Sequence, residues 1–325
     1  MTGHDAVADT ARTYQRFAKL EARGRSRLYE TWATAVASDS EVLAFLAQLP
    51  AHKRQPNLLF AAARWLAGTP TTYTGFRAVV LDRAGELEHV ILARRTQTNE
   101  PARCATLLPT LAALPQPLAL LEVGASAGLT LLPDRYSYDY AGRAITAPDP
   151  AGPVLKCQPQ GPVPVPDRLP EIVWRAGIDL NPLDVTDDDD VAWLACLIWP
   201  GEQDREQRLA AAITVARRDP PRLVRGDLVD DLAVLAAQAP AEATLVVFHS
   251  AVLAYLSPPR RQDFAAAVGG LDALWLSNEG TSVLAELTDQ PAPPPGTAPF
   301  ILARDGRTPL AFTDPHGTWI QWLEP

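Results

Sequence analysis

The fold is decided by the stretch Leu118-Ala119-Leu120-Leu121-Glu122-Val123-Gly124-Ala125-Ser126-Ala127-Gly128-Leu129. Its first six residues predict a buried β-strand, because strands covered on both faces read as nearly continuous apolar runs. The glycines then allow a tight turn, and the small residues between them let a ligand approach main-chain atoms. A helix is expected after the turn, and its free N–H groups would face a carboxylate or a phosphate.

Short apolar runs alternate with helical stretches downstream of this turn. The predicted strands are residues 118–123, 172–180, 222–225, 244–249 and 271–277. The predicted helices between them are residues 191–199, 205–217, 230–237 and 260–268. Strands that alternate with helices favour a mostly parallel sheet with right-handed crossovers. A closing antiparallel hairpin is expected from residues 300–304 and 318–323.

The first 116 residues have a different character. Apolar side chains such as Tyr14, Phe17, Trp32 and Val36 recur at three- and four-residue spacing, which is typical of amphipathic helices. Residues 76–82 and 87–93 fit either a hairpin or two short helices. We therefore expect a mostly helical cap domain over residues 1–116 and a sheet domain over residues 117–325. Residues 135–170 are expected to form an insertion, with an extra strand near residues 136–140.

The composition limits the class of protein. The chain has 325 residues, 47% of them hydrophobic and 21% charged, which suits one large or two modest folded domains. A formal net charge of −9 argues against nucleic acid as a partner. Three separated cysteines and five scattered histidines form no metal-ligand cluster. With neither a signal peptide nor an apolar run long enough to span a membrane, we expect a cytoplasmic protein.

Polar residues follow the predicted strands at their carboxyl ends. Glu122 ends the first strand, Asp179 the second, and Asp227 closely follows the third. Because parallel strands end at one edge of a sheet, these side chains are expected to line a common ligand crevice. The expected ligand-binding residues are Glu122, Gly124, Ala125, Ser126, Gly128, Asp179, Leu180, Asp227 and Leu228.

This succession of motifs resembles that of class I S-adenosylmethionine-dependent methyltransferases, which have a Rossmann-like sheet. More closely, nearly the full chain resembles a bacterial family catalogued as domain of unknown function 2332. The methyltransferase resemblance implies that S-adenosylmethionine is the cofactor, with its amino-acid end near Gly124 and its ribose near Asp179. The gap from Gly128 to Asp179 is longer than the usual βαβ step of about 30 residues. Asp139 is therefore an alternative ribose-binding acid.

The acceptor of the methyl group is expected to be a small molecule. His249 is the candidate general base, because it ends a predicted strand beside the crevice. A core histidine with both ring nitrogens hydrogen-bonded is the other interpretation. The candidate substrate-binding residues are Asn99, Glu100, Arg103, Tyr255 and Glu279. For the first three, a capping and ion-pairing role is equally compatible with the sequence.

Other functions fit the same residues. The letters from Gly124 to Gly128 also spell G-x-S-x-G, the nucleophile elbow of serine hydrolases. Ser126 would then be the nucleophile, with Asp179 or Asp227 and with His249 or His316. The helical character of the first 110 residues and the lack of an HGGG-type loop argue against a hydrolase. A methyltransferase-like binding protein without catalysis and a fold that holds another adenosine-containing ligand are the remaining alternatives.

Overall fold

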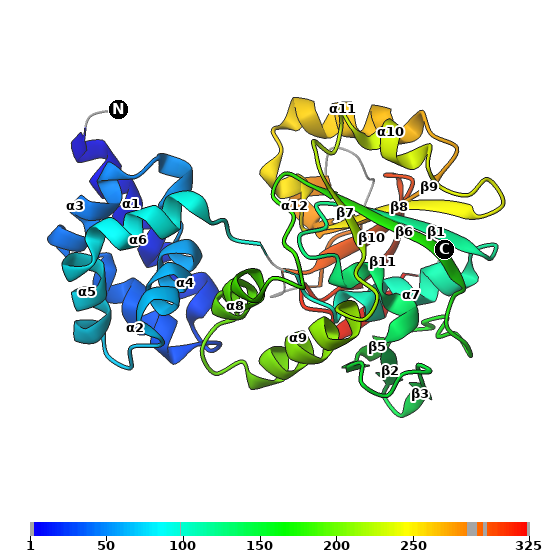
Figure 1. Cartoon of the computed structure of the whole chain (residues 1–325), viewed down its shortest axis with the longest axis horizontal. Helices are drawn as coiled ribbons and strands as arrows, with labels where there is room; N and C mark the ends of the chain where they lie inside the picture. The colour runs from blue at the N-terminus through cyan, green and yellow to red at the C-terminus, as the bar shows by residue number, and fades with distance from the viewer. Residues whose placement is uncertain (1–2, 98, 285–290, 295–297, 324–325) are drawn as a thin grey trace. The chain divides into compact units, whose positions relative to one another are not determined.

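The computed structural model describes residues 3–97, 99–284, 291–294 and 298–323. By its contacts, the chain divides into two compact units (Figure 1). The first unit comprises Met1–Thr98 and Asp188–Gln207, and the second comprises Asn99–Asp187 and Arg208–Pro325. The boundary predicted from the sequence lies at residue 116. The contacts instead group residues 99–116 with the sheet, and a later segment of the chain with the N-terminal helices.

The first unit is helical. Its longer helices are α1 (Gly3–Phe17), α2 (Arg27–Val36), α3 (Ser40–Gln48), α4 (Pro56–Ala67), α5 (Tyr73–Asp82), α6 (Ala84–Ala93) and α8 (Asp188–Leu197). Two short turns are also present, a π-helical one at Ala18–Ala22 and a 3-10 one at Ala51–Lys53. The two stretches that also fitted a hairpin are thus the helices α5 and α6. Stacked Trp32 and Phe76 rings, 4.5 Å apart, belong to the unit's aromatic core.

The second unit contains a sheet of nine strands in the order β5-β12-β11-β10-β9-β8-β1-β6-β7. Their bounds are β1 (Leu118–Val123), β5 (Gln158–Gln160), β6 (Ile172–Asp179), β7 (Arg222–Arg225), β8 (Thr244–Ser250), β9 (Leu274–Gly280), β10 (Phe300–Arg304), β11 (Thr308–Thr313) and β12 (Trp319–Trp322). The run from β7 through β6, β1 and β8 to β9 is parallel throughout. The expected large, mostly parallel sheet with N-terminal helices is therefore confirmed.

Helices cover both faces of this sheet. Figure 1 shows α10 (Leu232–Ala236) and α11 (Pro258–Gly269) on one face, and α7 (Arg103–Ala113) and α9 (Gln203–Ala216) on the other. Leu121 and Val123 pack with Phe264 and Val268 of α11 in the main hydrophobic core. All six residues of β1 are buried, which explains why this strand reads as a continuous apolar run.

The segment between β1 and β6 forms the expected insertion. It begins with two 3-10 turns, Leu129–Leu131 and Pro133–Arg135. The strand β2 (Ser137–Tyr140) then pairs with β3 (Arg143–Ile145) and β4 (Val154–Lys156) in a separate three-stranded sheet. A strand expected near residues 136–140 is therefore present. Asp139 accepts a hydrogen bond from the Gly142 N–H in the β2–β3 turn.

The closing hairpin differs from the expected one. β10 pairs with β11, which the sequence analysis missed, and β12 then pairs with β11. Asp305 and Gly306 form the tight turn between β10 and β11, with φ angles of 53° and 63°. Positive φ at two successive residues is the geometry of a type I′ turn, which Asp-Gly favours. That dipeptide was the available signal for the missed strand.

Candidate functional site

The candidate site lies at the carboxyl ends of the parallel strands. β1 pairs with β6 on one side and with β8 on the other, and Glu122 is in register with Gly177 and Phe248. The chain passes from β1 to β6 and β7, and only then crosses to β8 on the opposite side of β1. Open α/β sheets bind ligands at such a reversal of strand order, outside the carboxyl ends. The loop after β1 therefore occupies the position where a ligand crevice is expected.

This loop, residues 124–128, has an unusual backbone. Gly124, Ser126 and Gly128 have φ angles of 71°, 52° and 69°. The first glycine is required for space as well as for conformation, because a Cβ there would lie 2.3 Å from a methyl carbon of Val252. A non-glycine residue with positive φ, such as Ser126, is uncommon and needs support from its surroundings.

The surrounding side chains supply that support. Nδ2 of Asn99 donates to the Ala125 carbonyl at 2.8 Å, and its Oδ1 accepts from the Leu129 N–H at 3.0 Å. Oδ2 of Asp179 accepts from the Ser126 N–H at 2.9 Å. Two residues from the sequence-based set, Asn99 and Asp179, therefore hold the loop in place. Since β6 lies beside β1 and ends at Asp179, this aspartate, and not Asp139, is the acid next to the loop.

The helix expected after the glycine turn is absent from the described residues there. The chain instead forms the two short 3-10 turns that begin the insertion. Pro133 begins the second of these turns and has no backbone N–H to continue a hydrogen-bonded helix. The prediction that a helix N-terminus presents free N–H groups to a ligand at this position is therefore wrong.

Glu122 is a buried carboxyl group with an unsatisfied oxygen. Its Oε1 accepts a hydrogen bond from the Thr130 hydroxyl. Its Oε2 is buried and has no partner among the described residues. Burial raises the pKa of Glu122 to about 8, and the Thr130 hydrogen bond and the Arg103 charge only partly offset that rise. Burial therefore disfavours the ionised form of Glu122, and its Oε2 is left without a hydrogen-bond partner among the described residues.

Ser126 does not have the partners of a hydrolase nucleophile. Its hydroxyl is buried and unpartnered within the described part of the chain. Asp179 is bonded to main-chain N–H groups and Asp227 to main-chain N–H groups and Arg260, so neither holds a histidine there. The described residues therefore contain no Asp–His pair in the order that the hydrolase alternative needs.

His249 is enclosed in the core. Its Nδ1 is 2.7 Å from Oε1 of Glu279, and its Nε2 accepts a hydrogen bond from the Trp275 indole at 3.0 Å. The side chain is fully buried. Because both ring nitrogens are engaged, neither has a lone pair for a substrate proton, and the general-base role is not supported. The arrangement is that of the alternative interpretation, a satisfied core histidine.

Glu279 also forms hydrogen bonds with the backbone of the segment after β8. The same Oε1 also accepts from the N–H groups of Val252 and Leu253, at 2.7 and 3.1 Å. It thereby fixes the segment whose valine side chain packs on Gly124. Glu279 is fully buried, and its Oε2 has no hydrogen-bond partner among the described residues.

The remaining strand-end residues differ in exposure. Oδ1 of Asp227 accepts from the Val229 N–H at 2.8 Å and from Arg260 at 2.6 Å. Leu228 packs partly buried against the main core. The side chains of Leu180 and Tyr255 are exposed, at 56% and 72% of their surface. The carboxylate of Asp227 thus stabilises the turn in which it lies, whereas the apolar side chains of Leu180 and Tyr255 are accessible to a ligand.

Glu100 and Arg103 are buried and bind the start of α7 to other segments of the second unit. Oε1 of Glu100 accepts from Arg208 at 2.7 Å. Arg103 donates to the carbonyls of Pro315 and Ser250, at 2.9 and 3.1 Å. These contacts of Glu100 and Arg103 therefore agree with the ion-pairing and capping interpretation.

No group of three or more potential metal ligands occurs among the described residues. No helix of the described chain is both long enough and apolar enough to cross a bilayer.

The chain belongs to a bacterial protein family. Residues 11–322 match the sequence profile of the family described as "Uncharacterized protein conserved in bacteria (DUF2332)". The expected family membership is therefore confirmed. No curated protein matches the chain, and no solved structure matches it.

Proposed function

We propose that the carboxyl edge around Gly124 binds S-adenosylmethionine and that the chain is a methyltransferase for a small-molecule acceptor. The observation that carries this proposal is the buried, unpartnered Oε2 of Glu122 beside the strained loop. A buried carboxyl oxygen without a partner costs free energy that a bound donor or cation recovers. S-adenosylmethionine brings both an ammonium group and a sulfonium, and either cation favours the ionised form of Glu122.

The order of the strands supports this assignment. Numbered along the chain, the five parallel strands run third, second, first, fourth, fifth across the sheet. This is the order of a doubly wound nucleotide-binding fold, in which the ligand lies over the first strand. An antiparallel strand, β10, follows beside the fifth, as in the sheet of class I methyltransferases.

In this proposal, each strand-end residue contacts a different part of S-adenosylmethionine. Glu122 would face the amino-acid end of S-adenosylmethionine. Asp179 would accept from the ribose hydroxyls, because each carboxylate oxygen has a second lone pair beyond its main-chain bond. Leu180 and Tyr255 supply exposed apolar surface for the adenine or the acceptor.

Catalysis in this proposal depends on positioning. Methyl transfer needs the acceptor atom aligned with the sulfonium, and a fixed geometry supplies much of the rate enhancement. The bonded ring of His249 takes no part as a base. The proposal therefore favours an acceptor that needs no proton removed by the protein.

Isothermal titration with S-adenosylmethionine and S-adenosylhomocysteine tests the proposal. Wild-type protein is expected to bind S-adenosylmethionine saturably. Glu122→Gln should weaken binding by about 10-fold or more, because a hydrogen bond to a charged group contributes roughly 1.5–3 kcal/mol. Glu171→Gln is the matched control, since this exposed residue directly precedes β6 at the opposite, amino-terminal end of the strands. Absence of saturable heat, or equal affinity of Glu122→Gln and wild type, contradicts the proposal.

A serine hydrolase is the second candidate, because the hydroxyl of Ser126 is unpartnered and its φ is positive. A fluorophosphonate probe decides between the two. The methyltransferase proposal predicts no labelling that Ser126→Ala removes. Labelling of wild type that disappears in Ser126→Ala would favour the hydrolase.

A further inference from the structure

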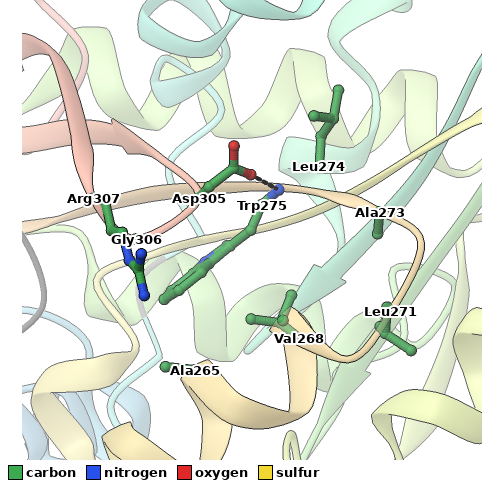
Figure 2. A pocket seen from close by; sticks show the side chains of 10 residues that line it. Ala265, Val268, Leu271, Ala273, Leu274, Trp275, Asp305, Gly306 and Arg307 are labelled. Carbon is green, nitrogen blue, oxygen red and sulfur yellow. Dashed lines mark hydrogen bonds between the residues drawn. The ribbon is translucent and has the colours of Figure 1, made fainter.

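A concave groove lies at the amino-terminal end of β9. It has a volume of about 620 Å³ and opens beside Leu274 and Trp275 (Figure 2). The site around Gly124 follows the carboxyl ends of the parallel strands, so the two are separate. The walls of the groove come from the end of α11, the loop before β9 and the β10–β11 turn. Its apolar lining residues are Ala265, Val268, Leu271, Ala273, Leu274 and Trp275.

The indole of Trp275 is held rigidly in this groove. Its Nε1–H donates to His249 at 3.0 Å. Its backbone N–H donates to Oδ1 of Asp305 at 3.1 Å, and its carbonyl accepts from the Asp305 N–H at 2.7 Å. Gly306 lies directly on the ring, because a Cβ there would come within 2.2 Å of a ring carbon. Only 6% of Trp275 is exposed, so the ring is a rigid part of the groove wall and offers a ligand a small surface at little entropic cost.

The groove is lined by one cation, Arg307, and one anion, Asp305. Arg307 lines it, is exposed, and has no side-chain partner among the described residues. Figure 2 labels it among the residues that line the groove, with Asp305, Gly306 and Trp275. The carboxylate of Asp305 is already occupied by the Trp275 N–H and lies 3.7 Å from Arg304. In a chain with a net charge of −9, an unpaired cation over an apolar floor selects for an anion.

We propose that this groove binds a small aromatic carboxylate. The apolar body would lie on the partly exposed Leu271, Ala273 and Leu274, beside the exposed part of the indole, and the carboxylate would pair with Arg307. The volume lies within the range of about 300–1,000 Å³ that is usual for small-molecule sites. Arginine suits a carboxylate because its planar fork can donate two parallel hydrogen bonds. This inference stands independently of the proposed methyltransferase activity.

The test uses the indole N–H signals of the full-length protein labelled with ¹⁵N-tryptophan. The chain has eight tryptophans, and Trp275→Phe identifies the signal of the groove. The probe is 2-naphthoate, and 2-naphthylmethanol is its neutral counterpart. We expect 2-naphthoate to shift the Trp275 signal saturably, and the alcohol to bind more weakly.

Two arginine variants make the test specific. Arg307→Ala should weaken 2-naphthoate binding about threefold to tenfold, the range for an exposed ion pair with good hydrogen-bond geometry. Arg304→Ala is the control, because this neighbour belongs to the same hairpin but does not line the groove. The proposal is overturned if the Trp275 signal does not move, or if both variants and the wild type bind equally. Undisturbed signals from the other tryptophans establish that the variants are folded.

Discussion

The substitution Gly124→Ala tests how tightly the loop after β1 is packed. The new Cβ would meet the two methyl carbons of Val252 at 2.3 and 2.8 Å, at a residue with φ of 71°. The left-handed conformation costs alanine roughly 1–2 kcal/mol, and overpacking adds roughly 1–3 kcal/mol. A shift of Val252 away from the new Cβ is opposed by the hydrogen bond from its N–H to Glu279. We expect Gly124→Ala to lower the free energy of unfolding by about 2–5 kcal/mol.

A double-mutant cycle separates the two costs. Val252→Ala removes both methyl groups, so the double variant should be more stable than the sum of the single effects by about 1–3 kcal/mol. Gly142→Ala is the control for the backbone term alone, because its φ is 96° and a Cβ there would meet no atom within 4 Å. Urea unfolding followed by circular dichroism measures all four variants and the wild type. The reasoning is refuted if the two single effects are additive, or if Gly124→Ala costs no more than Gly142→Ala.

Three further predictions follow from the same contacts. The pKa of Glu122 is about 8 in the folded protein, against a usual value of 4.5. Between pH 4.5 and pH 8 the folded state therefore binds more protons than the unfolded state. The free energy of unfolding should fall over this range as pH rises, by on the order of 4 kcal/mol. Urea unfolding at pH 5 and pH 8 should show this loss in wild type and a smaller one in Glu122→Gln; equal losses would contradict it. Asn99→Ala should cost about 1–3 kcal/mol in thermal or urea unfolding, since it leaves the Leu129 N–H and a carbonyl unpaired, and an unchanged midpoint would show that the loop holds itself. His249→Phe should cost about 3–5 kcal/mol by the same assay, because it removes the partner of the buried Glu279, and a neutral effect would argue against a core role.

The parallel strands could be predicted because burial imposes a simple pattern. β1 and β7 were predicted with the bounds that the structure has, and β6 and β8 within one residue. β1 is buried at all six positions and reads as a continuous apolar run, whereas the edge strand β7 has a short apolar centre between two exposed arginines. The positions of Glu122 and Asp179 at strand ends follow from those limits.

The rest of the site depends on contacts that a linear pattern does not contain. The ring of His249 is occupied by Trp275 and Glu279, which come from a strand 26 to 30 residues away in the chain. Thr130, the partner of Glu122, lies where a helix was expected. The glycine turn after a buried strand predicted that helix, but Pro133 begins a 3-10 turn there, and this turn packs against α7.

The central claim is that S-adenosylmethionine binds on the loop after β1, and ultraviolet cross-linking of the methyl-labelled cofactor tests it most directly. Tryptic cleavage would release residues 104–135 as one peptide, since Arg103 and Arg135 flank that stretch without another lysine or arginine between them. The account predicts label in this peptide, displaced by excess S-adenosylhomocysteine and reduced in Glu122→Gln. Label confined to other peptides, or label that the competitor does not displace, would contradict it.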